Sequence, residues 1–132
     1  MDIHEIVDIL SQLKIDNVKL NEPLKKHSSI KIGGNAQIFV DIKSQKQLKD
    51  CVSFLKSINY KFVVLGNGTN TLFGDNGYSG AVLCLGKNLR DFKIYEDGIY
   101  AQAGLGLFEF NKICRNNGFG GLEFSYGIPG SI

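Results

Sequence analysis

The chain has 132 residues, a formal net charge of +2 and a hydrophobic share of 43%. Such a length and composition predict one folded domain and exclude a disordered or low-complexity chain. The longest apolar runs reach only five residues, far short of the roughly 20 that a membrane-spanning helix needs. Basic residues form no stripe, so neither a membrane nor a nucleic-acid partner is expected. The three cysteines are widely spaced, which predicts neither a disulfide framework nor a metal site and favours a reducing cytoplasm.

The beginning of the chain predicts a helix followed by a connector. Apolar residues recur at helical spacing over residues 2–14, and Asp2 with Glu5 three positions later has the pattern of a capping box. Residues 16–36 have no clear period and contain Pro23. We therefore expect a connector there, with one short strand.

A strand–helix–strand unit is predicted next. Residues 37–42 have a strand pattern, and a helix is expected to start at Ser44 with Gln47 in the capping-box position. The segment Phe62–Leu65 is fully apolar, which is typical of a strand that is buried on both faces of a sheet. The two strands of this unit are expected to be parallel.

The second half of the chain predicts both strands and a helix. A buried strand is expected over residues 80–85, and residues 91–103 are expected to form a hairpin around Asp97-Gly98. Residues 106–117 predict a helix whose inward side chains are Leu107, Phe110, Ile113 and Cys114. This mixture, with antiparallel pairing late in the chain, predicts the α+β class.

Glycine is unevenly distributed, with two glycines in residues 1–65 and fourteen in residues 66–130. The first glycine-rich segment directly follows the apolar strand at residues 62–65, the position where parallel sheets bind ligands. Bare backbone can approach a phosphate closely, and successive N–H groups form an anion nest. The segment lacks the features of a P-loop or a Rossmann fingerprint. Its candidate cofactor-binding residues are Leu65, Gly66, Asn67, Gly68, Thr69, Asn70, Thr71 and Leu72.

A second glycine-rich segment lies near residue 130. Two glycines flank an Ile-Pro pair there, which predicts a rigid turn that can lie flat against a ring. The candidate cofactor-binding residues are Gly127, Ile128, Pro129, Gly130 and Ser131. For both segments a plain turn without a ligand is the alternative, and we expect Gly33-Gly34 to serve as a turn.

No catalytic constellation is visible in the sequence. There is no Ser-His-Asp arrangement, no metal-ligand spacing and no close pair of carboxylates that would favour acid–base chemistry. No catalytic residue and no metal ligand are therefore predicted. His4 and His27 are isolated, so we expect surface or hydrogen-bonded histidines rather than ligands.

The order and spacing of these segments resemble those of a known family. The run from His27 to Ala36 precedes the strand–helix–strand unit, Leu65–Leu72 ends it, and Gly-Leu-Glu-Phe and Gly-Ile-Pro-Gly-Ser follow within residues 121–131. Over residues 20–132 the chain resembles the amino-terminal part of the UDP-N-acetylenolpyruvoylglucosamine reductases, also called UDP-N-acetylmuramate dehydrogenases. Thr69 stands where that family usually has serine.

The resemblance implies an FAD-binding domain of the vanillyl-alcohol-oxidase (PCMH) type. Residues 1–20 would be an amino-terminal helix and linker, residues 21–87 a first βαβ subdomain, and residues 88–132 the start of a mixed, antiparallel α+β subdomain. FAD would bind noncovalently, with the segment after residue 65 around its pyrophosphate and residues 127–131 beside the flavin ring.

The resemblance also implies an activity. The family reduces UDP-N-acetylglucosamine enolpyruvate to UDP-N-acetylmuramate with NADPH, a cytoplasmic step of peptidoglycan synthesis on which cell shape and cell division depend. The family's proton donor, arginine and glutamate lie beyond the matched region. We therefore expect a truncated FAD-binding domain without the substrate domain, inactive by itself and weak in binding FAD. The alternatives are another flavin oxidoreductase of the same fold or a non-enzymatic nucleotide-binding module.

Overall fold

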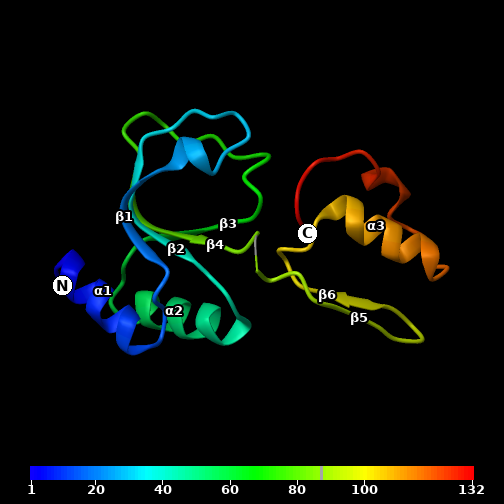
Figure 1. Cartoon of the computed structure of the whole chain (residues 1–132), viewed down its shortest axis with the longest axis horizontal. Helices are drawn as coiled ribbons and strands as arrows, with labels where there is room; N and C mark the ends of the chain where they lie inside the picture. Colours follow the sequence, from blue (N-terminus) through cyan, green and yellow to red (C-terminus); the bar gives the residue numbers. More distant parts are fainter. Residues whose placement is uncertain (87) are drawn as a thin grey trace.

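The structure is a computed structural model that describes residues 1–86 and 88–132. Figure 1 shows a sheet with helices on one face, followed by a hairpin and a helix that form a second lobe. The elements in chain order are α1 (Ile3–Gln12), β1 (Val18–Pro23), the 3-10 helix η1 (Leu24–Lys26), β2 (Asn35–Asp41), α2 (Gln45–Ser57), β3 (Phe62–Leu65), β4 (Tyr78–Cys84), β5 (Phe92–Ile94), β6 (Ile99–Ala101), α3 (Leu107–Asn116) and the 3-10 helix η2 (Glu123–Ser125).

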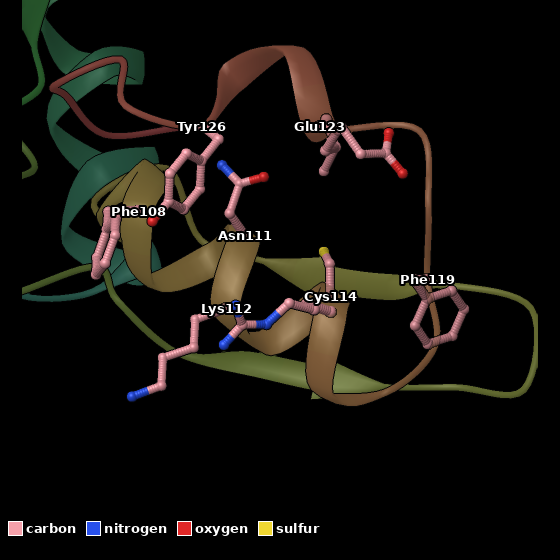
Figure 2. Close-up of a pocket in the computed structure, with 9 residues that line it drawn as sticks. Phe108, Asn111, Lys112, Cys114, Phe119, Glu123 and Tyr126 are labelled. Carbon is pink, nitrogen blue, oxygen red and sulfur yellow. The ribbon is translucent and has the colours of Figure 1, made fainter.

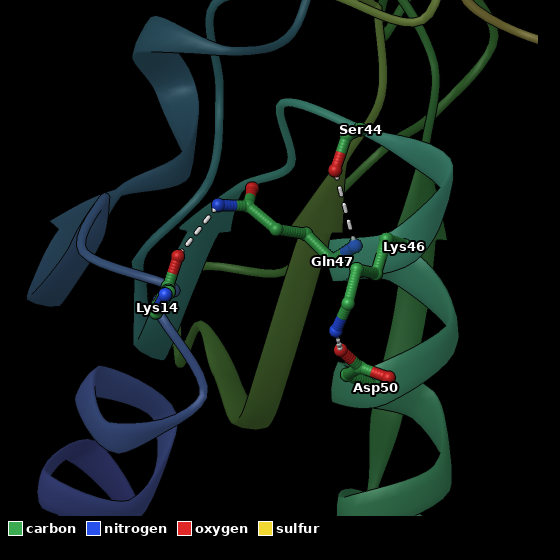
Figure 3. Close-up of polar contacts among 5 residues, drawn as sticks. All are labelled: Lys14, Ser44, Lys46, Gln47 and Asp50. Atoms are coloured by element: carbon green, nitrogen blue, oxygen red, sulfur yellow. Dashed lines mark hydrogen bonds and ion pairs between the residues drawn. The ribbon is translucent and has the colours of Figure 1, made fainter.

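The two amino-terminal helices begin where their capping residues predict. Asp2 and Glu5 form a complete capping box at α1. At α2 the Ser44 hydroxyl accepts the Gln47 N–H at 3.2 Å, but the Gln47 side chain does not close the predicted box. Its amide nitrogen instead donates to the Lys14 carbonyl at 2.7 Å (Figure 3). Gln47 therefore ties the start of α2 to the turn after α1.

The first sheet has the strand order β1-β2-β4-β3. β2 and β3 each pair in parallel with β4, and β1 is antiparallel to β2. The two strands of the predicted βαβ unit are thus parallel, with β4 inserted between them. The prediction that β3 is buried on both faces is wrong, because β3 lies at the sheet edge and Val64 is 47% exposed.

Two apolar clusters pack on opposite faces of this sheet. α1 and α2 cover one face, where Ile6, Leu10, Cys51 and Leu55 contact side chains of β2 and β4. The other face carries a second cluster, whose buried residues are Leu24, Ala36, Phe39, Leu65, Phe73, Val82 and Cys84. The alternation of side chains along β4 supplies both clusters. The second cluster extends to the carboxyl ends of β3 and β4, where Leu65 and Cys84 belong to it. It therefore packs beneath the loops that follow these two strands.

Cys51 provides a test of the first cluster. Burial raises the pKa of its thiol to about 12, and the thiolate is the reactive form. We expect native Cys51 to react with iodoacetamide at pH 8 roughly a thousandfold or more slowly than a free cysteine. Peptide mass spectrometry after timed labelling measures the rate, with urea-unfolded chain as the control. Labelling of native Cys51 at the unfolded rate would contradict this packing.

The second lobe has a thinner core. The hairpin β5–β6 forms around the predicted Asp-Gly turn. α3 ends at Asn116, and Gly118, with a φ of +76°, follows the C-cap residue Asn117 and lets the chain leave the helix. Of the predicted inward side chains of α3, only Cys114 is buried, whereas Leu107, Phe110 and Ile113 are half-buried. No helix within residues 1–86 and 88–132 is long and apolar enough to cross a membrane.

Candidate functional site

The carboxyl ends of β3 and β4 open into a cavity of about 290 Å³. Gly66 and Asn67 follow β3, Gly86 follows β4, and the segment from Lys26 to Ser29 closes the opposite side. The cavity therefore lies where parallel sheets bind ligands. Its lining residues are Lys26, His27, Ser28, Ser29, Gly66, Asn67, Cys84 and Gly86.

The structure brings the two predicted segments together. We call residues 66–72 the first glycine loop and residues 127–131 the second glycine loop. The Thr69 hydroxyl donates to the Pro129 carbonyl at 3.2 Å, across 60 positions of sequence. The Ser131 hydroxyl lies so close to Gly66 that a Cβ on Gly66 would stand 2.3 Å from it. The two predicted segments thus lie against each other at the edge of the cavity.

Gly68 makes the closest backbone contact of the first glycine loop. Its φ is +65°, and a Cβ there would stand 1.9 Å from the His27 carbonyl oxygen. The Gly68 carbonyl also accepts the Ser29 N–H at 3.0 Å. Only glycine allows this approach, because it has no Cβ and tolerates a positive φ. The loop and the Lys26–Ser29 segment are therefore held directly against each other.

The first glycine loop presents backbone donors. Among the residues that the structure describes, the N–H groups of Asn67, Gly68 and Thr69 have no hydrogen-bond acceptor. Successive N–H groups in a glycine-rich turn form nests that bind anions. Asn67 and Lys26 line the cavity, whereas Gly68 and Thr69 follow in the loop outside the lining. The arrangement is suited to bind a phosphate or pyrophosphate group.

His27 is paired, as the sequence predicts for an isolated histidine. Its Nε2 lies 2.9 Å from Glu22 Oε1, and its ring stacks on Phe39 with centroids 4.1 Å apart. The hydrogen bond from His27 lowers the pKa of the Glu22 carboxyl from its ordinary value of 4.5, and nearby Lys19 and Lys26 act in the same direction. The side chains of His27 and Glu22 are 10% and 13% exposed.

The lowered pKa of Glu22 gives a pH-dependent stability. A carboxyl with a lowered folded pKa stabilises the fold above its unfolded pKa and loses this contribution as the pH falls through the folded value. Glu22→Gln keeps an acceptor but removes the charge, so we expect wild type to exceed the variant by about 1 kcal/mol at pH 7. The gap should close below pH 4.5, the ordinary value. Urea unfolding across pH measures it, and a constant gap would contradict the lowered pKa of Glu22.

Several predicted residues lie outside the cavity lining, and several lining residues were not predicted. Leu65 belongs to the second apolar cluster, whereas Leu72 is 67% exposed and Ile128 is 49% exposed. The other predicted residues outside the lining are Gly68, Thr69, Asn70, Thr71, Gly127, Pro129, Gly130 and Ser131. Sequence reasoning did not identify the Lys26–Ser29 wall or Gly86. The available signal was the run after His27, which carries part of the family resemblance.

A second cavity, of about 600 Å³, lies between α3 and η2. Asn111 and Cys114 point from α3 into this space, beside Glu123 and Tyr126 (Figure 2). Asn111 donates to the Ser125 hydroxyl at 2.8 Å, and burial raises the pKa of the Cys114 thiol. None of the predicted site residues lines this cavity. Within the described ranges, no group of three or more His, Cys, Asp and Glu side chains is placed to hold a metal ion.

Comparison with known proteins identifies the family of this chain. The sequence model of the family described as "FAD binding domain" matches residues 36–132. The chain belongs to the FAD binding domain family. The match starts within β2 and includes both glycine loops. Of the cavity lining, Gly66, Asn67, Cys84 and Gly86 lie within the matched region, whereas the Lys26–Ser29 wall precedes it.

Similar curated proteins carry the name UDP-N-acetylenolpyruvoylglucosamine reductase. This chain is 33% identical to the Clostridioides difficile protein over 126 residues, which cover 96% of this chain and 41% of that relative. It is 38% identical to the Clostridium tetani protein over 127 residues, which again cover 96% of this chain and 41% of that relative. The chain thus spans about 41% of the length of these curated relatives.

A solved structure shares the fold. The crystal structure of UDP-N-acetylenolpyruvylglucosamine reductase from Thermus caldophilus matches with a TM-score of 0.58 and 25% identity. The match covers 86% of this chain and 38% of that protein. The predicted α+β FAD-binding fold, and the resemblance on which it rests, are therefore confirmed.

Proposed function

We propose that this chain binds FAD noncovalently through the two glycine loops and the Lys26–Ser29 segment. The observation that carries the proposal is the row of N–H groups at Asn67, Gly68 and Thr69 without acceptors among the described residues. The pyrophosphate of FAD supplies the anion that such a nest binds, and its negative charge is opposite to that of Lys26. Family membership supports FAD as the nucleotide.

The cavity fits such a group because two glycines, Gly66 and Gly86, keep the ends of β3 and β4 free of side chains. A Cβ on Gly86 would stand 2.4 Å from Asn67 Oδ1 and 2.9 Å from the Gly66 carbonyl oxygen. Side chains at these positions would fill the space beside the N–H groups. We propose that the first glycine loop holds the pyrophosphate, and that the backbone of residues Gly127 to Ser131 lies beside the flavin ring.

The proposed activity is that of the reductase whose name the relatives carry. The chain would be the FAD-binding portion of an NADPH-dependent enzyme that reduces UDP-N-acetylglucosamine enolpyruvate to UDP-N-acetylmuramate in the cytoplasm. When bound, FAD supplies hydride transfer between the nicotinamide and the enolpyruvyl double bond. The residues of this chain bind and orient the cofactor. Peptidoglycan synthesis, cell shape and cell division would depend on this reaction.

We propose that the residues of this chain bind the cofactor and that none of them is a catalytic residue of the reductase. Cys114 lines the separate α3 cavity, and Ser131 lies against Gly66 and pairs with Gly106, so neither takes the place of a proton donor. We therefore expect no oxidation of NADPH by the 132-residue chain with FAD and the enolpyruvyl substrate. An absorbance assay at 340 nm measures this. Turnover above a blank without protein would contradict the assignment.

Ligand competition tests the proposed cofactor. We expect FAD to bind weakly, and ADP to compete with it because ADP shares both the adenosine and the pyrophosphate of FAD. UDP-N-acetylglucosamine shares only the pyrophosphate, so it should compete less. Flavin fluorescence with each competitor at equal concentration measures the order. Equal competition by ADP and the UDP-sugar would favour a general nucleotide-binding module. If FAD does not bind and the UDP-sugar does, the proposal is wrong.

A further inference from the structure

Glu22 and His27 form a polar pair, of which His27 lines the candidate cavity. Glu22 lies on β1, and His27 directly follows η1. Their side chains are only 13% and 10% exposed, and the 2.9 Å contact joins Glu22 Oε1 to His27 Nε2. A pair so shielded from water has a fixed geometry, because either partner alone would lose its hydrogen bond on moving.

The surroundings of His27 restrict its ring further. The ring stacks on Phe39 with centroids 4.1 Å apart and an interplanar angle of 27°. Phe39 is only 1% exposed and belongs to the second apolar cluster. Lys19 Nζ lies 3.7 Å from Glu22 Oε1 and 5.9 Å from the Phe39 ring centroid. The side chain of His27 is thus held by both β1 and β2.

The backbone of His27 reaches in the other direction, to the first glycine loop. The contact between its carbonyl and Gly68 leaves no space for a Cβ. The next two residues also bond to the loop, since the Ser28 hydroxyl donates to the Thr71 carbonyl at 3.0 Å and the Ser29 N–H donates to the Gly68 carbonyl at 3.0 Å. His27 therefore connects the sheet to the loop that presents the N–H groups.

We propose that the Glu22–His27 pair is a positioning device for the FAD cavity. The pair fixes the Lys26–Ser29 segment against Gly68, and the segment in turn fixes the spacing between the two walls of the cavity. Neither side chain needs to contact the cofactor for this role. The link to FAD rests on the proposed function, whereas the positioning of the segment does not.

Amide hydrogen exchange tests the positioning directly. In His27→Ala and Glu22→Ala we expect the Ser29 N–H, which bonds to Gly68, to exchange at least tenfold faster. The Leu85 N–H, which donates to the Leu65 carbonyl at 2.8 Å within the sheet region, should change less than twofold. Glu22→Gln keeps an acceptor for His27 and should restore Ser29 exchange to within twofold of wild type.

A matched control separates positioning from general destabilisation. Ile42→Val alters a buried residue of the first apolar cluster, on the opposite face of the sheet. Hydrogen exchange is compared at matched global stability: for each variant, the urea concentration is chosen so that the unfolded fraction is the same as in the control. In Ile42→Val, the ratio of the Ser29 exchange rate to the Leu85 exchange rate should equal that of wild type. Unchanged Ser29 exchange in both alanine variants, or equal acceleration in the control, would overturn the proposal.

FAD titration of the same variants tests the link to the cofactor. We expect the FAD dissociation constant to rise about tenfold in His27→Ala and Glu22→Ala and less than twofold in Glu22→Gln. Faster Ser29 exchange with an unchanged dissociation constant would overturn the cavity role of the pair. If wild type binds no FAD, the proposed function fails, and the exchange data alone still decide whether the pair positions the segment.

Discussion

Gly68→Ala is expected to lower the affinity for FAD by at least tenfold and the free energy of unfolding by about 1–3 kcal/mol. The methyl group would occupy a residue with a φ of +65° and would meet the His27 carbonyl oxygen at 1.9 Å. Because that neighbour is backbone, the loop and the Lys26–Ser29 segment must separate. Urea unfolding and FAD fluorescence titration measure the two effects.

Gly74→Ala is the matched control for this substitution. Gly74 lies in the same connection between β3 and β4, its φ is not positive, and a Cβ there would meet nothing within 4 Å. We expect a change in stability of less than about 0.5 kcal/mol and unchanged FAD affinity. If Gly68→Ala behaved like Gly74→Ala, the close approach at Gly68 would have no role in the site.

Phe39→Ala is expected to give the largest loss of stability, about 3–5 kcal/mol. Phe39 is the largest fully buried side chain of the second cluster, and its ring also supports His27. Removal would leave a cavity beneath the Lys26–Ser29 segment, so FAD affinity should fall as well. Since small domains are stable by only about 5–15 kcal/mol, chemical denaturation at low temperature is the suitable measurement.

Val64→Ala provides the comparison within the same sheet. Val64 is 47% exposed on the edge strand, so its truncation should lower the free energy of unfolding by less than about 1 kcal/mol. The loss of free energy of unfolding for Phe39→Leu should lie between the losses for Phe39→Ala and Val64→Ala. Equal losses for Phe39→Ala and Val64→Ala would show that the second cluster is not the core of this face.

The local elements could be predicted from the sequence because their signals are local. Asp2 and Glu5 are three positions apart, and the turn at Asp97-Gly98 contains its own hairpin signal. The position of β4 between β2 and β3 has no such signal, because apolar alternation does not specify the neighbour of a strand. For the same reason the sequence wrongly predicted that β3 would be buried on both faces.

The site was predictable in part for a comparable reason. The first glycine loop follows an apolar strand, and the carboxyl end of a parallel strand is a general ligand site. The contact between Thr69 and Pro129 joins residues 60 positions apart. It has no local signal; the shared richness in glycine and the resemblance to the reductases, which implies one FAD for both segments, were the only indications that the segments meet. The Lys26–Ser29 wall was not predicted, because its side chains have no period and its role comes from contacts with Gly68 and Phe39.

Titration of isotope-labelled chain with FAD, followed by amide NMR shifts, tests the central claim most directly. The claim is that FAD binds at the two glycine loops, with the Lys26–Ser29 segment as one wall of the cavity. We predict the largest shifts at the N–H groups of Asn67, Gly68 and Thr69, followed by Ser29 and Gly130. Shifts confined to the α3 cavity around Asn111 and Cys114, or no shifts at millimolar FAD, would contradict the account.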